Sequence, residues 1–301
     1  MRATGTNRRA FNLKEAIIEK LLLISASISI VIVVLIFIFL LSQAVPAFGK
    51  ISIIEFFTGQ NWQPTSAIQP EFGTLPLAYG TALVTTIAMG ISIPLGLAIA
   101  VYIAEIANSI EKEILKPIVE LLASVPSVVY GFFALVTLAT WIQQLTGTGS
   151  RLNALNGGII LAIMALPTIV SLAEDAITSV PREYREASLA LGASNWETIR
   201  SAVVPSSASG ILGAILLGFG RAIGETMAVL MATGNTAQII FSTLAATRTI
   251  TATIVIETLE SAFGSLHYNV LFALALYLFA ITFAFNYVAG IYMRRFRRMG
   301  R

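Results

Sequence analysis

The chain has 301 residues, of which 56% are hydrophobic and 12% are charged, with a net charge of +3 and a mean hydropathy of +0.82. This composition excludes an ordinary soluble domain. The absence of cysteine excludes disulfides and thiolate metal sites, and no phosphate-binding Gly-x-x-x-x-Gly-Lys-Ser/Thr loop occurs. We therefore predict an all-α, polytopic membrane protein without catalytic residues, metal ligands or a nucleic-acid partner. Any ATP hydrolysis is assigned to a separate chain.

Six apolar runs have the roughly 20 residues that are needed to cross about 30 Å of hydrocarbon. The first run is too long for the core of a cleavable signal peptide, the alternative interpretation, and predicts a retained anchor. Pro94 predicts a kink in the second run. The predicted spans are residues 21–41, 75–104, 117–139, 157–176, 210–231 and 269–293.

The segments between the spans differ in their content of Lys and Arg. Fifteen of the 19 basic residues fall in the N-terminal segment 1–20, the connection 105–116, the segment 181–205 and the tail 294–301. The positive-inside rule therefore places both termini and segment 181–205 in the cytosol. Residues 1–20 are predicted to form an interfacial helix and 294–301 a basic cytosolic tail.

Two segments are predicted to lie outside: 46–73, which is polar, aromatic and rich in turn residues, and 234–268, which is mixed in composition with a Thr-rich middle. The second of them is expected to combine an outer loop with a re-entrant or amphipathic helix. The single histidine, His267, is expected to be an interfacial polar residue rather than a ligand.

Segment 181–205, PREYREASLALGASNWETIRSAVVP, is a polar stretch between the fourth and fifth spans. Its apolar residues recur at three- to four-residue intervals, for example at Leu189, Ala193 and Trp196. This spacing predicts two short amphipathic helices, broken at Gly192. The segment is either an ordinary solvated loop or a helical surface that docks on another protein.

Arg221 and Glu225 are charged residues near the middle of the fifth predicted span, four positions apart. That spacing predicts that both lie on one helix face and pair. A charge at membrane depth is costly, so the face should meet protein or a water-lined path. One interpretation is a structural ion pair that pins helix packing. The other is that Arg221 meets an anion in transit and Glu225 orients or neutralises it, since the guanidinium fork suits an oxyanion.

Several motifs carry a family resemblance. Glu186-Ala187, Gly192 and Pro205 resemble the EAA loop of ABC importer permeases, with departures at Ser188, Ala202 and Val204. Four further stretches resemble the permease subunits of phosphate ABC importers, so that the resemblance runs from about residue 15 to residue 292. These stretches are FFTGQNWQP at 56–64, FGTLPLAYGT at 72–81, SVPSVVYGFF at 124–133 and RAIGETMAV at 221–229.

The resemblance implies a type I ABC importer permease fold in a prokaryotic plasma (inner) membrane. It also implies a homologous permease partner, two ATPase subunits that bind the ATP, and an extracytoplasmic phosphate-binding protein; the chain itself holds no cofactor. Segment 181–205 would contact the ATPase, and Arg221 and Glu225 would line the phosphate path. Two alternatives stay open: a permease for sulfate, molybdate or tungstate, and an ATPase-independent secondary transporter or a membrane scaffold.

Overall fold

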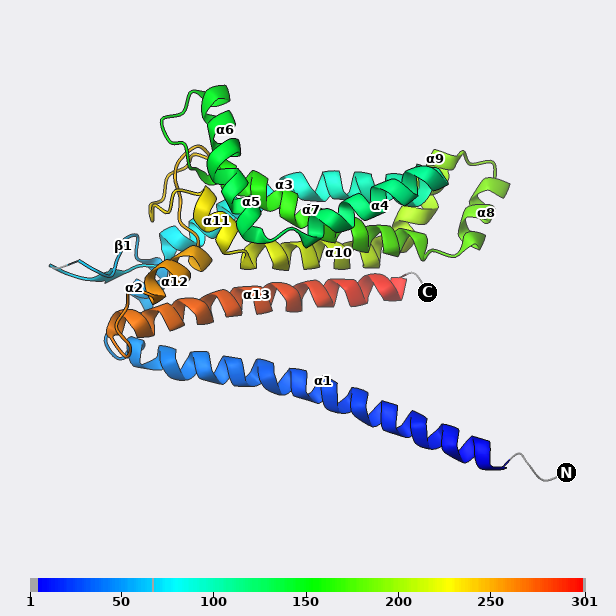
Figure 1. The fold of residues 1–301 in the computed structure, drawn as a ribbon, viewed down its shortest axis with the longest axis horizontal. Helices are drawn as coiled ribbons and strands as arrows, with labels where there is room; N and C mark the ends of the chain where they lie inside the picture. Colours follow the sequence, from blue (N-terminus) through cyan, green and yellow to red (C-terminus); the bar gives the residue numbers. More distant parts are fainter. Residues whose placement is uncertain (1–4, 67, 300–301) are drawn as a thin grey trace.

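Apolar helices run side by side along most of the molecule in the computed structural model, which describes residues 5–66 and 68–299 (Figure 1). Side chains are described for residues 15, 17–66 and 68–291. Most of the predicted interfacial segment 1–20 and all of the basic tail 294–301 lie outside the described side chains.

Helices make up most of the described chain. Two short strands, β1 (Trp62–Gln63) and β2 (Glu71–Phe72), pair antiparallel with Trp62 opposite Phe72. Three π-helical turns interrupt the helices: η1 (Tyr102–Ile106), η2 (Ala134–Leu138) and η3 (Ile199–Val203). The α-helices are α1 (Gly5–Phe48), α2 (Ile53–Thr58), α3 (Leu75–Val101), α4 (Ser109–Ser124), α5 (Ser127–Phe133), α6 (Ala139–Thr146), α7 (Ala154–Thr178), α8 (Arg182–Ala190), α9 (Asn195–Thr198), α10 (Val204–Gly224), α11 (Met227–Ala232), α12 (Ile250–Thr258) and α13 (Leu266–Met299).

Among the described residues, six helical segments are long and apolar enough to cross a membrane. This number agrees with the prediction, and the chain is an all-α, multi-pass membrane protein. The segments are Ile17–Phe48, Leu75–Ile106, Ser127–Thr146, Ala154–Thr178, Asn195–Gly224 and Leu266–Ile291.

Helix α7 forms the centre of the bundle, where it packs against both α3 and α10 (Figure 1). Glycines allow this close approach on both sides of Ile169. A Cβ atom at Gly96 of α3 would lie 2.8 Å from Ile169 Cγ2, and one at Gly218 of α10 would lie 2.5 Å from Ile169 Cγ1. Small residues permit such packing between membrane helices, which lack a hydrophobic driving force toward one another.

Replacing Gly218 with valine is expected to destabilise the bundle, because the new side chain overlaps Ile169. Overpacking of this kind costs about 1–3 kcal/mol. Gly220→Val is the matched control on the same helix, since a Cβ atom there meets no heavy atom within 4 Å. Thermal unfolding of both variants in detergent would measure the difference, and equal Tm values would contradict the packing argument.

The third span lies further along the chain than the predicted 117–139. Helix α4 ends before Val125, whose backbone is extended (φ −67°, ψ 128°), and the apolar span begins only at Ser127. The cause is Pro126, because the residue before a proline is disfavoured in the helical region. The apolar run is therefore divided between two helices.

Helix α4 is amphipathic rather than membrane-spanning, and none of its residues is buried. It starts at a capping box in which Asn108 and Glu111 satisfy each other's backbone N–H groups. The predicted connection 105–116 is thus mostly helical. Lys116 Nζ lies 2.8 Å from Glu174 Oε2 of α7, which fastens α4 to the central helix. This hydrogen bond raises the pKa of Lys116 above its ordinary value.

The fifth span also differs from the predicted 210–231, because it runs from Asn195 to Gly224. Glu225 leaves the helix with an extended backbone (φ −67°, ψ 136°). Its carboxylate accepts the backbone N–H of Ala228 at 3.3 Å, so it serves the start of α11 instead of continuing α10. Glycine at the preceding position weakens the helix further.

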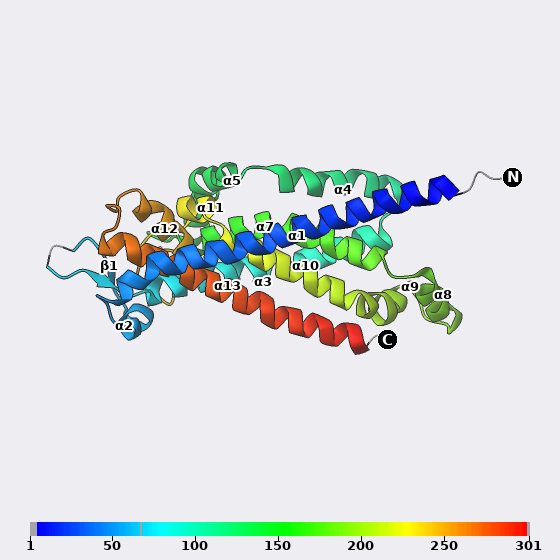
Figure 2. The same ribbon diagram turned by 90° about the horizontal axis from the view of Figure 1, so that it is seen from below.

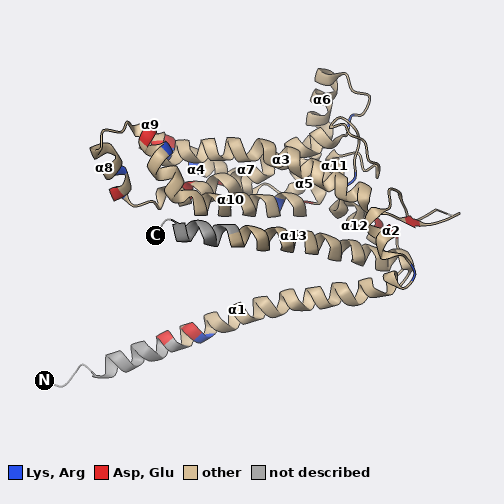
Figure 3. Cartoon of the chain, turned by 180° about the vertical axis from the view of Figure 1, so that it is seen from behind, with Lys and Arg blue, Asp and Glu red and all other residues tan. Residues whose placement is uncertain are grey.

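The two ends of the bundle carry different elements (Figures 1 and 2). One end has α8 and α9, together with the N-terminal end of α1 and the C-terminal end of α13. The opposite end has the β1–β2 hairpin, α2, α6, α11 and α12. Charged residues gather toward these ends, and the long helices between them carry few (Figure 3). The predicted outer segment 234–268 contains α12, which is buried over most of its length.

Candidate functional site

Arg221 lies in the last turn of α10 and is exposed at the surface of the chain. The prediction that it lies near the middle of the fifth span is wrong, because the helix ends three residues later. A cation at a helix C-terminus is favoured by the helix dipole. Within the described part of the chain, Arg221 takes part in none of the ion pairs.

Glu225 does not share a helix face with Arg221, so the predicted pairing is wrong. Its side chain is engaged with the N–H of Ala228, and its main-chain oxygen accepts the Thr251 hydroxyl at 2.8 Å. Glu225 therefore joins the ends of three helices, α10, α11 and α12. Because Arg221 is exposed and makes no ion pair with a described residue, the donors of its fork remain available to a ligand outside this chain.

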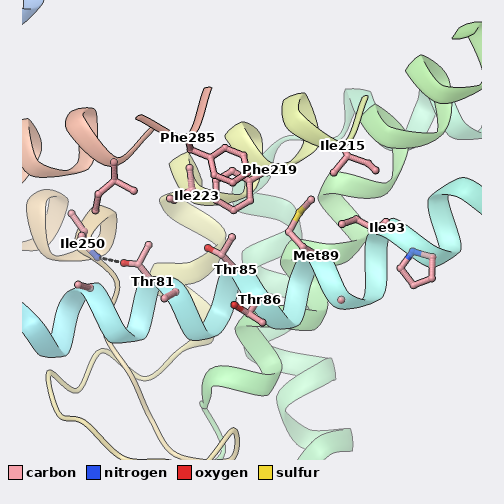
Figure 4. Close-up of a pocket in the computed structure, with 15 residues that line it drawn as sticks. Thr81, Thr85, Thr86, Met89, Ile93, Ile215, Phe219, Ile223, Ile250 and Phe285 are labelled. Carbon is pink, nitrogen blue, oxygen red and sulfur yellow. Dashed lines mark hydrogen bonds between the residues drawn. The ribbon is translucent and has the colours of Figure 1, made fainter. Parts of the chain in front are cut away.

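A cavity of about 750 Å³ lies between α3, α10 and α13 (Figure 4). Its walls are almost entirely apolar, with Met89, Phe219 and Ile223 among them, and Phe219 stacks on Phe285 at 3.6 Å. Arg221 is not among the lining residues. An ionised group would be poorly solvated here, so this cavity does not suit an anion.

The ends of α8 and α9 meet at Gly192, whose φ of +88° is in the left-handed region. The helix break that the sequence predicted at this position is present. Glycine adopts this conformation without a Cβ penalty. Ser194 and Glu197 form a capping box that starts α9, and the Ser188 and Thr198 hydroxyls bond across the turn at 2.9 Å. The two helices therefore form one compact unit.

Arg185 fastens this unit to the membrane helices. Its guanidinium donates to Glu105 in η1, with Nε 3.2 Å from both carboxylate oxygens, and to the Val180 carbonyl at 2.6 Å. The hydrogen bond to Glu105 raises the pKa of Arg185 above its ordinary value. Sequence reasoning missed this contact, because 80 residues separate the partners.

The surface of the α8–α9 unit exposes both polar and large apolar residues. Glu186 and Ala187 are both exposed on α8. Large apolar side chains are exposed around them, a feature that marks protein-docking sites. These are Tyr184, Leu189, Leu191 and Trp196, with exposed fractions of 50%, 45%, 90% and 61%.

Pro205 is the second residue of α10, which begins directly after the π-helical turn η3. Proline has no backbone N–H and clashes with the preceding turn, and a widened turn accommodates this defect. As a result, α9, η3 and α10 form one continuous helical span from Asn195 to Gly224. At 1.5 Å per residue it is about 45 Å long, and it connects the α8–α9 unit to Arg221.

Comparison with known proteins gives the family. Residues 92–298 match the family described as "binding-protein-dependent transport system inner membrane component". The probable ABC transporter permease protein YqgH of Bacillus subtilis is 40% identical over 78% of this chain and 76% of its own length. The phosphate transport system permease protein PstC of Mesorhizobium japonicum is 35% identical over 84% and 81%.

The fold is shared with a solved bacterial ABC transporter that is involved in the import of alginate. One of its chains has a TM-score of 0.62 at 15% identity, over 94% of this chain and 99% of that chain. The family match covers more than half of the sequence. The six candidate spans are in keeping with a membrane component of this kind. The chain belongs to the family of binding-protein-dependent transport system inner membrane components, the permease subunits of ABC importers.

Proposed function

We propose that this chain is a permease subunit of an ATP-driven importer of inorganic phosphate. The observation that carries the proposal is its similarity, over most of its length, to permeases named for phosphate transport. Its family places it in the inner membrane as a multi-pass, non-enzymatic subunit, with a separate ATPase and a substrate-binding protein as partners. Phosphate itself is an expectation from the relatives.

The ATPase is expected to dock on the α8–α9 unit. The exposed apolar residues around Leu191 and Trp196 supply the contact area, and Glu186, Ala187 and Gly192 lie on the same unit. Arg185 links the unit to Glu105 at the end of the second span. Closure of the two ATPases on ATP therefore moves α8 and α9 together with the membrane helices attached to them.

The continuous span Asn195–Gly224 carries this motion to the other end of the bundle. A rigid helix turns a tilt at α9 and Pro205 into a displacement of Arg221. Arg221 receives the anion through its planar fork. The carboxylate of Glu225, at the junction beyond α10, repels the anion and so keeps the affinity of the path for phosphate low. A low affinity is needed because a tightly held anion would not leave the path.

The second half of the path is expected to come from a homologous permease in a hetero-pair. Arg221 is exposed on this chain, and a charge in a membrane span needs protein or water beside it. A partner permease facing Arg221 would supply both. The extracytoplasmic binding protein is expected at the end that carries the β1–β2 hairpin.

Uptake by membrane vesicles tests the substrate. We expect ATP-dependent accumulation of labelled phosphate in the presence of the binding protein, with little competition from sulfate, molybdate or tungstate. Preferential uptake of one of these anions would instead favour the oxyanion alternative. Uptake that continues without any ATPase would favour a secondary transporter.

The orientation of the chain has its own test. The positive-inside rule puts the α8–α9 unit and both termini in the cytosol. Gln60 and Ala190 are both exposed, and the chain has no native cysteine. Single cysteines at these two positions are expected to react with an impermeant maleimide from opposite sides of sealed vesicles. Labelling of both from one side would overturn the topology.

A further inference from the structure

Glu257 of α12 is a buried carboxylate at the centre of a hydrogen-bond network. It is 6% exposed, and it accepts from Trp62 Nε1 at 2.9 and 3.1 Å and from Arg248 Nη1 at 2.7 Å. The His267 ring Nε2 lies 2.8 Å from its second oxygen. These partners come from the β1–β2 hairpin, from the segment before α12 and from the start of α13. One side chain thus joins three parts of the end of the molecule that carries the hairpin.

The other end of α12 is fixed to the transport helices. The Ile250 N–H donates to Thr81 Oγ1 of α3 at 2.9 Å (Figure 4), and the Thr251 hydroxyl donates to the Glu225 main-chain oxygen at 2.8 Å. A Cβ atom at Gly80 would lie 2.3 Å from the Arg248 oxygen, so α3 and this segment touch backbone to backbone. Helix α12 therefore begins against the junction that follows Arg221.

The burial of α12 makes it a rigid connection between these two sets of contacts. Its nine residues span about 13 Å at 1.5 Å per residue. Most of them are buried, including Ile250, Thr253 and Glu257. A displacement of one end is passed to the other, because a packed helix resists bending and has few alternative positions.

The β1–β2 hairpin is in a position to receive an external partner. It projects from the end of the molecule opposite α8 and α9 (Figure 1), and Ile68 near its tip is 99% exposed. The base of the hairpin is tied down at Trp62, which is only 5% exposed. A protein that pushes on the hairpin therefore acts on Glu257.

We propose that α12 carries the docking of the extracytoplasmic binding protein from the β1–β2 hairpin to the main chain of Glu225, and that Glu257 is the positioning residue that fixes the hairpin to α12. The inference rests on the proposed function, and it assigns Glu257 and Thr251 a role in signal transfer. Neither residue touches the transported anion. Both act through the position of the junction after Arg221.

Two substitutions interrupt the connection at its opposite ends. Glu257→Gln keeps the size of the side chain but replaces one carboxylate oxygen, an acceptor, by an NH2 group, a donor. That donor would face Arg248 or His267. Thr251→Val keeps the shape and removes the hydroxyl that bonds to Glu225. Thr258→Val is the matched control on the same helix, because the exposed Thr258 hydroxyl donates to the Ile254 carbonyl within its own turn and reaches no other helix in the described part of the chain.

The test uses the complete transporter in proteoliposomes. ATPase activity per assembled complex is measured with and without the phosphate-loaded binding protein. We expect Glu257→Gln and Thr251→Val to keep the basal ATPase activity. The stimulation by the binding protein, measured as the ratio of the activities with and without it, is expected to fall about fivefold or more. Thr258→Val is expected to match the wild type. A purely structural role would lower the yield of assembled complex and leave the stimulation ratio unchanged.

A second measurement follows the conformation directly. A Cβ atom at Gly220 meets no heavy atom within 4 Å, so Gly220→Cys introduces a lone thiol beside Arg221. In the wild-type background, we expect docking of the binding protein to change the rate of maleimide labelling at this position. In the Thr251→Val background, we expect that change to disappear.

The two failures are distinguishable. If the wild-type vesicles accumulate no phosphate with the loaded binding protein, the proposed function fails, and this inference fails with it. If they do accumulate phosphate but Thr251→Val retains full stimulation and the labelling change, α12 is not the connection. Should Glu257→Gln fail to assemble, Thr251→Val alone decides, because it leaves the Glu257 network intact.

Discussion

Replacing Arg221 with glutamine is expected to lower phosphate uptake by about 100-fold, because two charge-assisted hydrogen bonds to the anion are lost, worth about 1.5–3 kcal/mol each before desolvation. Assembly of the complex is expected to stay normal, since Arg221 is exposed and makes no ion pair among the described residues. Uptake of labelled phosphate and the yield of purified complex measure the two effects separately.

Two further variants sharpen the result. Arg221→Lys keeps the charge but loses the planar fork, so intermediate uptake is expected. Arg151→Gln removes another exposed arginine, which bonds only to neighbouring residues of α6 and η2, and is expected to leave uptake close to normal. Normal uptake by Arg221→Gln would reduce Arg221 to a packing residue at the end of α10.

Replacing Gly192 with valine is expected to weaken the docking of the ATPase by about tenfold, because a left-handed backbone costs an L-residue roughly 1–2 kcal/mol. No heavy atom lies within 4 Å of a Cβ atom at this position. The effect is therefore conformational: the turn opens, and the angle between α8 and α9 changes. Apolar residues on either side of the turn, such as Leu191 and Trp196, would no longer face the same partner.

The amount of ATPase that co-purifies with the tagged permease measures this effect. Gly149→Val is the control, since Gly149 also has open space around it but lacks a positive φ. It lies in the loop after α6, at the end of the molecule away from α8 and α9. An unchanged ratio of ATPase to permease in Gly192→Val would show that the turn geometry does not govern docking.

The number of membrane spans and the helix break at Gly192 followed from the sequence, because both depend on local composition. Long apolar runs specify spans wherever they stand in the chain, and Gly192 supplies a left-handed residue between two amphipathic stretches. The ends of the spans were less well predicted. Pro126 divides the third apolar run, and hydropathy does not register such a break, although the residue before a proline is a known boundary signal.

Contacts between distant residues were beyond sequence reasoning. Trp62 and Glu257 are separated by 195 residues, yet they bond directly. The spacing of Arg221 and Glu225 predicted a helical pair, and the chain instead turns at Gly224 because the Glu225 carboxylate serves α11. Local spacing identifies residues that are able to interact, and tertiary contacts decide whether they do.

Helix α1 touches the rest of the chain mainly along α13, through pairs such as Phe37 with Phe279 and Phe39 with Phe272. Toward its N-terminal end it diverges from α13 (Figure 1), and the most apolar part of its span is not buried by this chain. Lipid or a neighbouring subunit must therefore solvate it. A purification tag or fluorophore fused ahead of α1 would lie at a distance from the helices that are expected to move, α8, α9 and α10. This terminus is therefore the practical place to attach one.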